Sequence, residues 1–155
     1  MAKKLALIAS KGTLDWAYPP FILASTAAAL DYEVQIFFTF YGLTLLRKDL
    51  SDLKVSPLGN PAMPMPVTMP NFVQMIPGME SMATLMMKHK IASKGVASIE
   101  DLRAACIESG VKLIACQMTV DLFDFDKAEF IDEIEYGGAA TFFEFAGESD
   151  VNLFI

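Results

Sequence analysis

Short apolar runs recur along this chain between longer stretches that carry a helical pattern, and few folds accommodate that alternation. The runs comprise residues 5–9, 34–38, 111–116 and 151–155. Each run is apolar almost throughout, which is typical of strands in a parallel sheet that is covered on both faces. The stretches between the runs are long enough for the crossover helices that parallel strands require.

The intervening stretches predict the helices that complete this alternation. The order from Ser98 to Asp101 is that of a helix-capping box, and Gly110 is placed to end the same helix in a left-handed turn. Pro19 and Pro20 are expected in or near the first turn of their helix, where proline is tolerated. Helices are expected at about 14–30, 43–48, from 71 with a break at 77–78, 79–90, 99–109, 119–125 and 139–146, with an acidic, partly helical connection at 126–135.

This order of elements predicts a single domain that spans residues 1–155. The expected architecture is α/β, with three layers and a flavodoxin-like arrangement in the broad sense. It consists of a mainly parallel sheet of about four or five strands with helices on both faces. A chain of this length buries a core without the help of disulfide bonds.

The hydrophobic content of the chain is high, at 54% of its residues. No uninterrupted apolar run approaches the ~20 residues that cross a bilayer, because Asp31, Glu33, Arg47 and Lys48 interrupt the best candidates. We therefore expect no membrane span. A homo-oligomer with apolar interfaces explains the composition instead.

Charge and cysteine content indicate the compartment and exclude one class of partner. Lys3 and Lys4 precede an apolar run that is too short for a secretory signal, so the protein is expected to be cytoplasmic. The two cysteines fit that compartment, because thiols stay reduced there. The net charge of −7 argues against nucleic acid, which requires a basic surface.

A proline-rich stretch interrupts the alternation between about residues 53 and 70. Prolines exclude a regular helix or a central strand there, so the stretch predicts a long loop with a functional role or an oligomer contact. Eight of the ten methionines lie between Met63 and Met87. Thioethers bind copper(I), so a copper site is one interpretation of this cluster. They also make adaptable apolar contacts, and an interface with another subunit or a partner is the favoured interpretation. A non-catalytic, partner-binding subunit that uses this Pro/Met-rich surface is therefore an alternative to a catalytic function.

Cys116 closes the third apolar run and is the leading candidate for a functional residue. The residues after it are more helical than extended, so we expect it at the carboxyl end of a buried parallel strand, where α/β sheets bind ligands. The first free N–H groups of the following turn would favour a thiolate there. A buried, inert thiol is the ordinary alternative for a free cysteine, and position alone does not decide between the two.

Three other features have an ordinary structural explanation. Cys106 shares the apolar face of its predicted helix with Ile99 and Leu102, as a core thiol does. His89, the only histidine, lies among lysines at a helix C-terminus, where cations complement the helix dipole. The acidic residues between 121 and 135 lack the spacing of an EF-hand loop and are interpreted as a solvated face. We therefore predict no metal site and no cofactor.

The turn after the first apolar run is a second candidate region. Its residues, Ser10-Lys11-Gly12-Thr13, lack the order of a phosphate-binding loop. If the first strand and the Cys116 strand are neighbours, Lys11 would lie close enough to stabilise a sulfur anion. A plain turn with a solvated lysine is the alternative.

Four segments of the chain together resemble the DsrE/DsrF-like sulfurtransferase family. They keep their order and span nearly the whole sequence, and the likeness is closest to the DsrE-like branch often found beside rhodanese-like and TusA-like sulfur carriers. The segments are SKGTLD (residues 10–15), FFTFYGL (37–43), ACQM (115–118) and EYGGAATF (135–142).

This resemblance implies that Cys116 accepts sulfur as a persulfide or thiosulfonate and passes it on in a cytoplasmic sulfur relay. The protein would be a true sulfurtransferase or a stoichiometric sulfur carrier, a trimer, hexamer or other homo-oligomer, with TusA-like or rhodanese-like carriers as partners. The chemistry is a displacement like that of disulfide exchange and needs no histidine. The residues expected to bind substrate are Lys11, Gly12, Phe40, Tyr41, Gln117, Met118 and Thr119.

Overall fold

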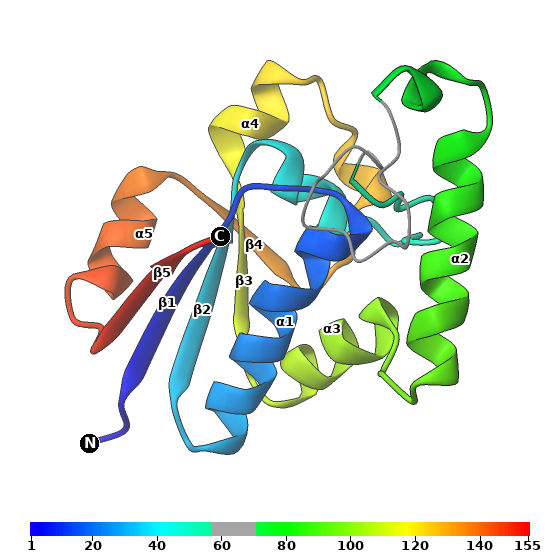
Figure 1. Cartoon of the computed structure of the whole chain (residues 1–155). Helices are drawn as coiled ribbons and strands as arrows, with labels where there is room; N and C mark the ends of the chain where they lie inside the picture. The colour runs from blue at the N-terminus through cyan, green and yellow to red at the C-terminus, as the bar shows by residue number, and fades with distance from the viewer. Residues whose placement is uncertain (57–70) are drawn as a thin grey trace.

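Five strands form one sheet, in the spatial order β4-β3-β2-β1-β5. The computed structural model describes residues 1–56 and 71–155. Every neighbouring pair of strands is parallel, which confirms the α/β class and the predicted sheet (Figure 1). The strands are β1 (Lys4–Ala9), β2 (Glu33–Phe38), β3 (Lys112–Cys116), β4 (Ile134–Gly137) and β5 (Val151–Phe154).

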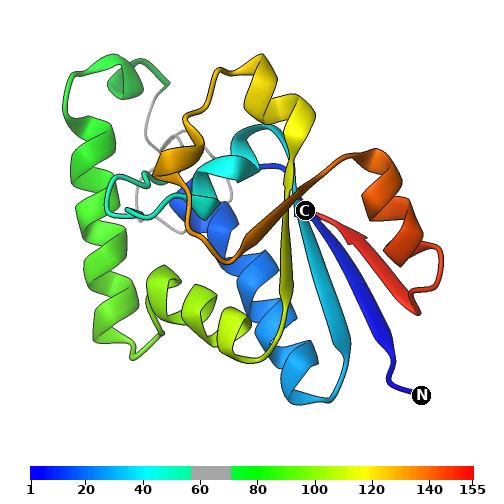
Figure 2. The same cartoon turned by 180° about the vertical axis from the view of Figure 1, so that it is seen from behind.

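Helices cover both faces of the sheet, but unequally (Figures 1 and 2). Helices α1 and α3 pack side by side on one face, and α2 lies on their outer side, whereas α5 is the only described helix on the opposite face. The helices are α1 (Leu14–Ala29), α2 (Met79–Ser93), α3 (Ile99–Glu108), α4 (Gln117–Leu122) and α5 (Ala139–Ala146), with the 3-10 helices η1 (Phe40–Leu46), η2 (Asn71–Met75) and η3 (Lys127–Glu129).

The winding of the chain explains why α5 stands apart. From β1 to β4 each strand adds to the sheet on the same side of the one before, and β5 then returns to the far side of β1. Crossover connections between parallel strands are right-handed, so connections that run in opposite directions place their helices on opposite faces. The winding therefore reverses beside β1.

The sheet divides the apolar core into two clusters of different size. Side chains alternate along a strand, so Ala115 belongs to the cluster beneath α1 and α3, and Cys116 to the cluster beneath α5. The first cluster is the larger and includes Phe21. The second includes Phe37 and Phe142, whose ring centroids lie 5.7 Å apart. Cys116 therefore belongs to the smaller of the two cores.

Local sequence signals set the ends of α3 as predicted. The Ser98 hydroxyl oxygen accepts the N–H of Asp101 at 3.1 Å and satisfies a first-turn donor of the helix. Gly110 follows the helix with a φ of +80°, a conformation that glycine adopts without steric cost. The chain then enters β3 directly.

Two prolines lie farther inside α1 than expected. Pro19 and Pro20 lie beyond the first turn, and the helix continues through them. Without N–H groups they cannot bond to the carbonyls of Asp15 and Trp16, four residues earlier. The helix persists because its buried face, which includes Phe21, packs against the sheet.

Three other expected elements differ from the structure. The last residues of the expected acidic connection at 126–135 form the start of β4, a strand that the sequence did not predict. Glu135 and Tyr136 are exposed on this edge strand, so its sequence lacks the apolar run that marks the other strands. The expected helix at 43–48 is the 3-10 helix η1, and α4 begins two residues earlier than expected.

Large apolar side chains of α2 lie at the surface. Leu85 and Met86 are exposed, whereas the helix buries Ala83 and Thr84. The greater part of the predicted Pro/Met-rich loop, residues 57–70, lies outside the described residues.

Candidate functional site

Cys116 is the last residue of β3 and immediately precedes α4. Its strand lies inside the sheet between β2 and β4, and its register partner is Gly137. The predicted position at the carboxyl end of a buried parallel strand is therefore confirmed. Loops at this edge of an α/β sheet commonly form ligand sites.

The side chain of Cys116 belongs to the cluster beneath α5, together with Ile114 and Phe142. The first helical hydrogen bond of α5 runs from the Phe142 N–H to the Gly138 carbonyl, at 3.2 Å. Earlier N–H groups of a helix have no partner within the helix and form its positive end. The pairing of Cys116 with Gly137 thus places the cysteine beside the start of α5 as well as that of α4.

The thiol is more enclosed than the sequence suggests. Only 4% of Cys116 is exposed, and its sulfur makes no capping hydrogen bond to α4. The physical reason is the alternation along β3, which turns this side chain toward the core beneath α5. The expected contact between the thiol and the first N–H groups of α4 is therefore absent.

Cys106 has the structural role that the sequence predicts. It is fully buried on α3, and its thiol donates a hydrogen bond to the Phe21 carbonyl at 3.4 Å. Burial raises the pKa of this thiol from 9.0 to about 11, although a backbone hydrogen bond acts in the opposite direction. Cys106 therefore remains protonated at neutral pH.

The three predicted residues after Cys116 have different environments. Gln117 donates to the Asp121 carboxylate at 2.7 Å and accepts from the Lys127 ammonium at 2.9 Å. Met118 is exposed. Thr119 is fully buried, and its hydroxyl accepts the N–H of Phe40 at 3.1 Å. Thr119 therefore joins α4 to the turn after β2.

Phe40 and Tyr41 lie at the same edge of the sheet, at the start of η1, which contacts α4. Phe40 has a φ of +48°, an uncommon conformation for a residue with a side chain, and both side chains are largely exposed. Tyr41 stacks on Phe123 with ring centroids 5.8 Å apart, and Phe40 meets the same ring edge-on. Phe123, which immediately follows α4, has no signal in the sequence that marks it as part of this aromatic group.

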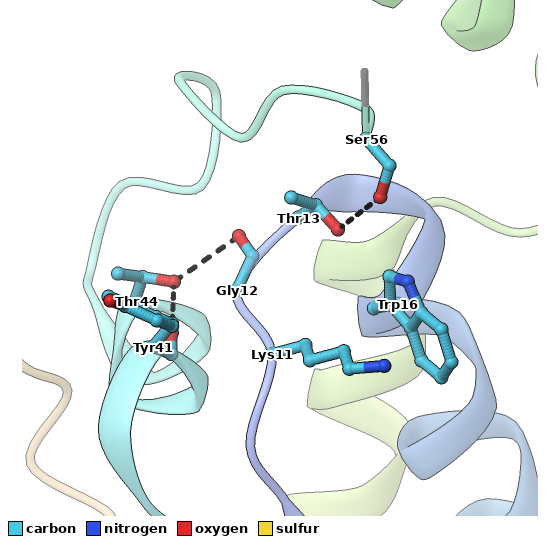
Figure 3. Close-up of a pocket in the computed structure, with 7 residues that line it drawn as sticks. All are labelled: Lys11, Gly12, Thr13, Trp16, Tyr41, Thr44 and Ser56. Carbon is cyan, nitrogen blue, oxygen red and sulfur yellow. Dashed lines mark hydrogen bonds between the residues drawn. The ribbon is translucent and has the colours of Figure 1, made fainter. Parts of the chain in front are cut away.

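A cavity of about 400 Å³ opens where the turn after β1 meets η1 and the start of α1 (Figure 3). We call it the Lys11 cavity. The Lys11 ammonium lies 3.3 Å from the centroid of the Trp16 ring, and the Thr13 and Ser56 hydroxyls are hydrogen-bonded at 3.1 Å. The cavity is lined by Lys11, Gly12, Thr13, Trp16, Tyr41, Thr44 and Ser56.

Three of the predicted substrate-binding residues, Lys11, Gly12 and Tyr41, thus line one cavity. Gly12 permits close packing of the turn on η1, because a Cβ there would lie 2.2 Å from the Tyr41 carbonyl oxygen and 2.3 Å from the Thr44 hydroxyl. Trp16, Thr44 and Ser56 were not expected to contribute. They come from three separate segments that only the fold brings together.

The Lys11 cavity does not adjoin Cys116 in the sheet. Strand β2 separates β1 from β3, which corresponds to about 10 Å between their ends. The cavity also lies on the α1 side, whereas the thiol lies beneath α5. Lys11 was expected to stabilise the sulfur anion only if β1 and the Cys116 strand, β3, were neighbours. They are not, so this condition is not met.

No metal-binding group of three His, Cys, Asp or Glu side chains occurs within the described ranges 1–56 and 71–155. His89 is exposed near the end of α2. Of the helices that the structure describes, none is both long and apolar enough to span a bilayer.

Comparison with known proteins covers nearly the whole chain. The profile of the DsrE/DsrF/DrsH-like family matches residues 1–154. The relative named "Sulfur carrier protein DsrE2", from Allochromatium vinosum, is 68% identical over 157 residues, which cover 99% of this chain and 98% of that protein. The uncharacterised protein YrkE of Bacillus subtilis is 37% identical over 164 residues, which cover 99% and 97%.

The fold also resembles a solved structure, that of the ychN protein from E. coli. The two structures have a TM-score of 0.55, the match covers 99% of each chain, and the sequences are 10% identical. At this identity the likeness concerns the fold alone.

Proposed function

Because the chain belongs to the DsrE/DsrF/DrsH-like family, we propose that it is a sulfur carrier that accepts sulfane sulfur or a thiosulfonate group on Cys116 and passes it to a partner carrier. The observation that carries the proposal is a cysteine at the carboxyl end of a parallel strand in a chain that is 68% identical to Sulfur carrier protein DsrE2. Cys106 is unsuited to the role, because it is fully buried and burial raises its pKa to about 11.

The transfer step is a displacement at sulfur. The Cys116 thiolate attacks the outer sulfur of a donor persulfide, a new S–S bond forms at Cys116, and the donor S–S bond breaks to release a donor thiolate. With thiosulfate as donor, the same attack on its sulfane sulfur releases sulfite.

Enclosure of the thiol sets a condition on this chemistry. Only 4% of Cys116 is exposed, and Phe142 of α5 packs in the same cluster. A donor must therefore displace part of this cover, and the first turn of the short helix α5 is the element we assign to that movement. Local opening of this kind needs far less free energy than global unfolding.

The proposal extends to the setting of the protein. It is a cytoplasmic homo-oligomer, trimer or hexamer, that exchanges sulfur with TusA-like or rhodanese-like carriers. Large exposed aromatic residues support an oligomer, because Phe143 is 68% exposed on α5 and Phe154 is 73% exposed on β5. Surfaces of this kind often mediate contacts between subunits.

Intact mass measurement after incubation with thiosulfate, tetrathionate or polysulfide tests the central step. Wild type and Cys106→Ser should gain a sulfur adduct that a reductant removes, whereas Cys116→Ser should not. Equal loading of Cys116→Ser and wild type would disprove the proposal. The Cys106→Ser variant is the matched control, because it removes the other thiol of the chain.

Exposed apolar side chains on α2 favour a second function, a partner-binding subunit in which Cys116 is inert. Leu85 and Met86 are exposed on this helix, which follows the Pro/Met-rich stretch and η2 in the sequence. The second function predicts that deletion of residues 63–69, or Leu85→Lys with Met86→Lys, abolishes complex formation while Cys116→Ser preserves it. Loss of sulfur transfer in Cys116→Ser, with partner binding intact, favours the carrier.

A further inference from the structure

We propose that the Lys11 cavity binds a small organic anion, at a site separate from the thiol of Cys116. The ligand class is a compact molecule with one acidic group and a flat or apolar body. Nothing in the sulfur-transfer chemistry of Cys116 requires this site. The inference goes beyond the proposed function and stands or falls independently of it.

The charge in the cavity favours an anion. Lys11 is the only charged residue among the described residues that line it, although the whole chain has a net charge of −7. Lys11 takes part in none of the ion pairs found within residues 1–56 and 71–155. Residues 57–70 contain neither aspartate nor glutamate, so that segment supplies no carboxylate as a counterion.

The nearby carboxylate on α1 is already engaged. Asp15, in the first turn of the helix, accepts the N–H of Ser56 at 2.8 Å. Burial alone would raise the pKa of Asp15, but hydrogen bonds from Ser56 and Thr13 outweigh it, so the pKa is lowered and the group stays ionised. Asp15 thus holds Ser56 against the start of α1.

The walls of the cavity favour an apolar body on the ligand. Trp16 of α1 and Tyr41 of η1 line the cavity on opposite sides of Lys11 and Gly12 (Figure 3). The hydroxyls are largely satisfied within the protein, because Thr13 and Ser56 bond each other and Thr44 donates to the Tyr41 carbonyl at 2.8 Å. The Lys11 ammonium lies over the Trp16 ring and makes no ion pair within residues 1–56 and 71–155, so it is the donor that an anion would meet. A volume of about 400 Å³ lies within the range of small-molecule sites.

The position of the cavity agrees with this use. It opens at the carboxyl edge of the sheet, between the turn after β1 and the 3-10 helix η1 that follows β2. Open α/β sheets bind ligands outside the carboxyl ends of their strands. Because the Cys116 side chain lies on the other face of the sheet, a ligand in the cavity does not occupy the space next to the thiol.

The single tryptophan of the chain, Trp16, makes the inference directly testable. Titration with benzenesulfonate should produce a saturable change in tryptophan fluorescence. Methanesulfonate, which has the charge without the ring, and benzyl alcohol, which has the ring without the charge, should each bind about tenfold more weakly, a loss of about 1.4 kcal/mol. Ligand-observed NMR of the same mixtures gives a second readout that does not depend on Trp16.

Variants separate charge from fold. Lys11→Met should weaken benzenesulfonate about tenfold, whereas Lys11→Arg should keep the affinity. Lys94→Met, at an exposed lysine after α2, is the matched control and should bind like wild type, as should Cys116→Ser. Three results would overturn the inference: no saturable binding of benzenesulfonate, binding of benzyl alcohol as tight as that of benzenesulfonate, or an unchanged affinity in Lys11→Met. Each of them leaves the proposal of sulfur loading on Cys116 untouched.

Discussion

The two cysteines of this chain lie on opposite faces of one sheet, and the two faces are built differently. Cys106 lies on α3, where that helix packs against α1 in the larger core, and Cys116 lies beneath α5 in the smaller one. Both are buried, with exposed fractions of 0% and 4%. They differ in their surroundings: the Cys106 thiol is enclosed between two packed helices, α3 and α1, whereas the Cys116 thiol is covered by the short helix α5. Burial alone thus does not distinguish a core thiol from a candidate carrier.

The largest expected difference between the faces is in packing energy. Phe21→Ala, in the core beneath α1, should lower the free energy of unfolding by about 4 kcal/mol, because it leaves a cavity in a fully enclosed site. Phe142→Ala, on α5, should cost about 2 kcal/mol, since its site borders solvent. Urea unfolding of both variants measures the two values. Equal losses would show that the two faces are packed alike.

The raised pKa of Cys106 predicts a dependence of stability on pH. The folded state holds this proton up to a pKa of about 11, compared with 9.0 for an ordinary thiol. The stabilisation is therefore complete below pH 9 and is lost as the pH rises through 11, with a loss of about 2–3 kcal/mol. Lysines and tyrosines titrate in the same range, so the test compares wild type with Cys106→Val across that range. Parallel curves for the two proteins would contradict the prediction.

The rates at which the two thiols are alkylated compare their accessibility on the two faces of the sheet. Iodoacetamide should alkylate Cys116 faster than Cys106, and Phe142→Ala should accelerate Cys116 about tenfold by removing part of its cover, a change of about 1.4 kcal/mol in the opening step. Peptide mapping by mass spectrometry assigns each rate. If the variant leaves the rate at Cys116 unchanged, α5 is not the cover that moves.

The smallest expected effect concerns the contact between α4 and the turn after β2. Thr119→Val removes the acceptor of the Phe40 N–H without a change in shape, and should destabilise the protein by about 1 kcal/mol. Thermal unfolding measures the loss, with Thr26→Val, at an exposed site on α1, as the control. A neutral result would mean that water replaces the threonine at this N–H group.

Much of the fold could be predicted because its signals are local. Apolar runs mark four of the five strands, and the cap at Ser98 and the turn at Gly110 mark the ends of α3. Strand β4 could not be recognised, because an edge strand with exposed Glu135 and Tyr136 lacks an apolar run.

The site was predictable to a smaller extent. The end of β3 is a local property, so the position of Cys116 followed from the sequence. The order of strands and the face to which a side chain points depend on the whole fold, and these separate Lys11 from Cys116. The same dependence explains why Trp16, Thr44 and Ser56 meet in a cavity that no motif announces.

The central claim is that Cys116 holds transferable sulfur, and cyanolysis tests it most directly. Cyanide removes the outer sulfur of a persulfide as thiocyanate and regenerates the cysteine thiolate. After loading with polysulfide and desalting, wild type and Cys106→Ser should release about one thiocyanate per chain, and Cys116→Ser none. Release from Cys116→Ser at the level of wild type would contradict the account.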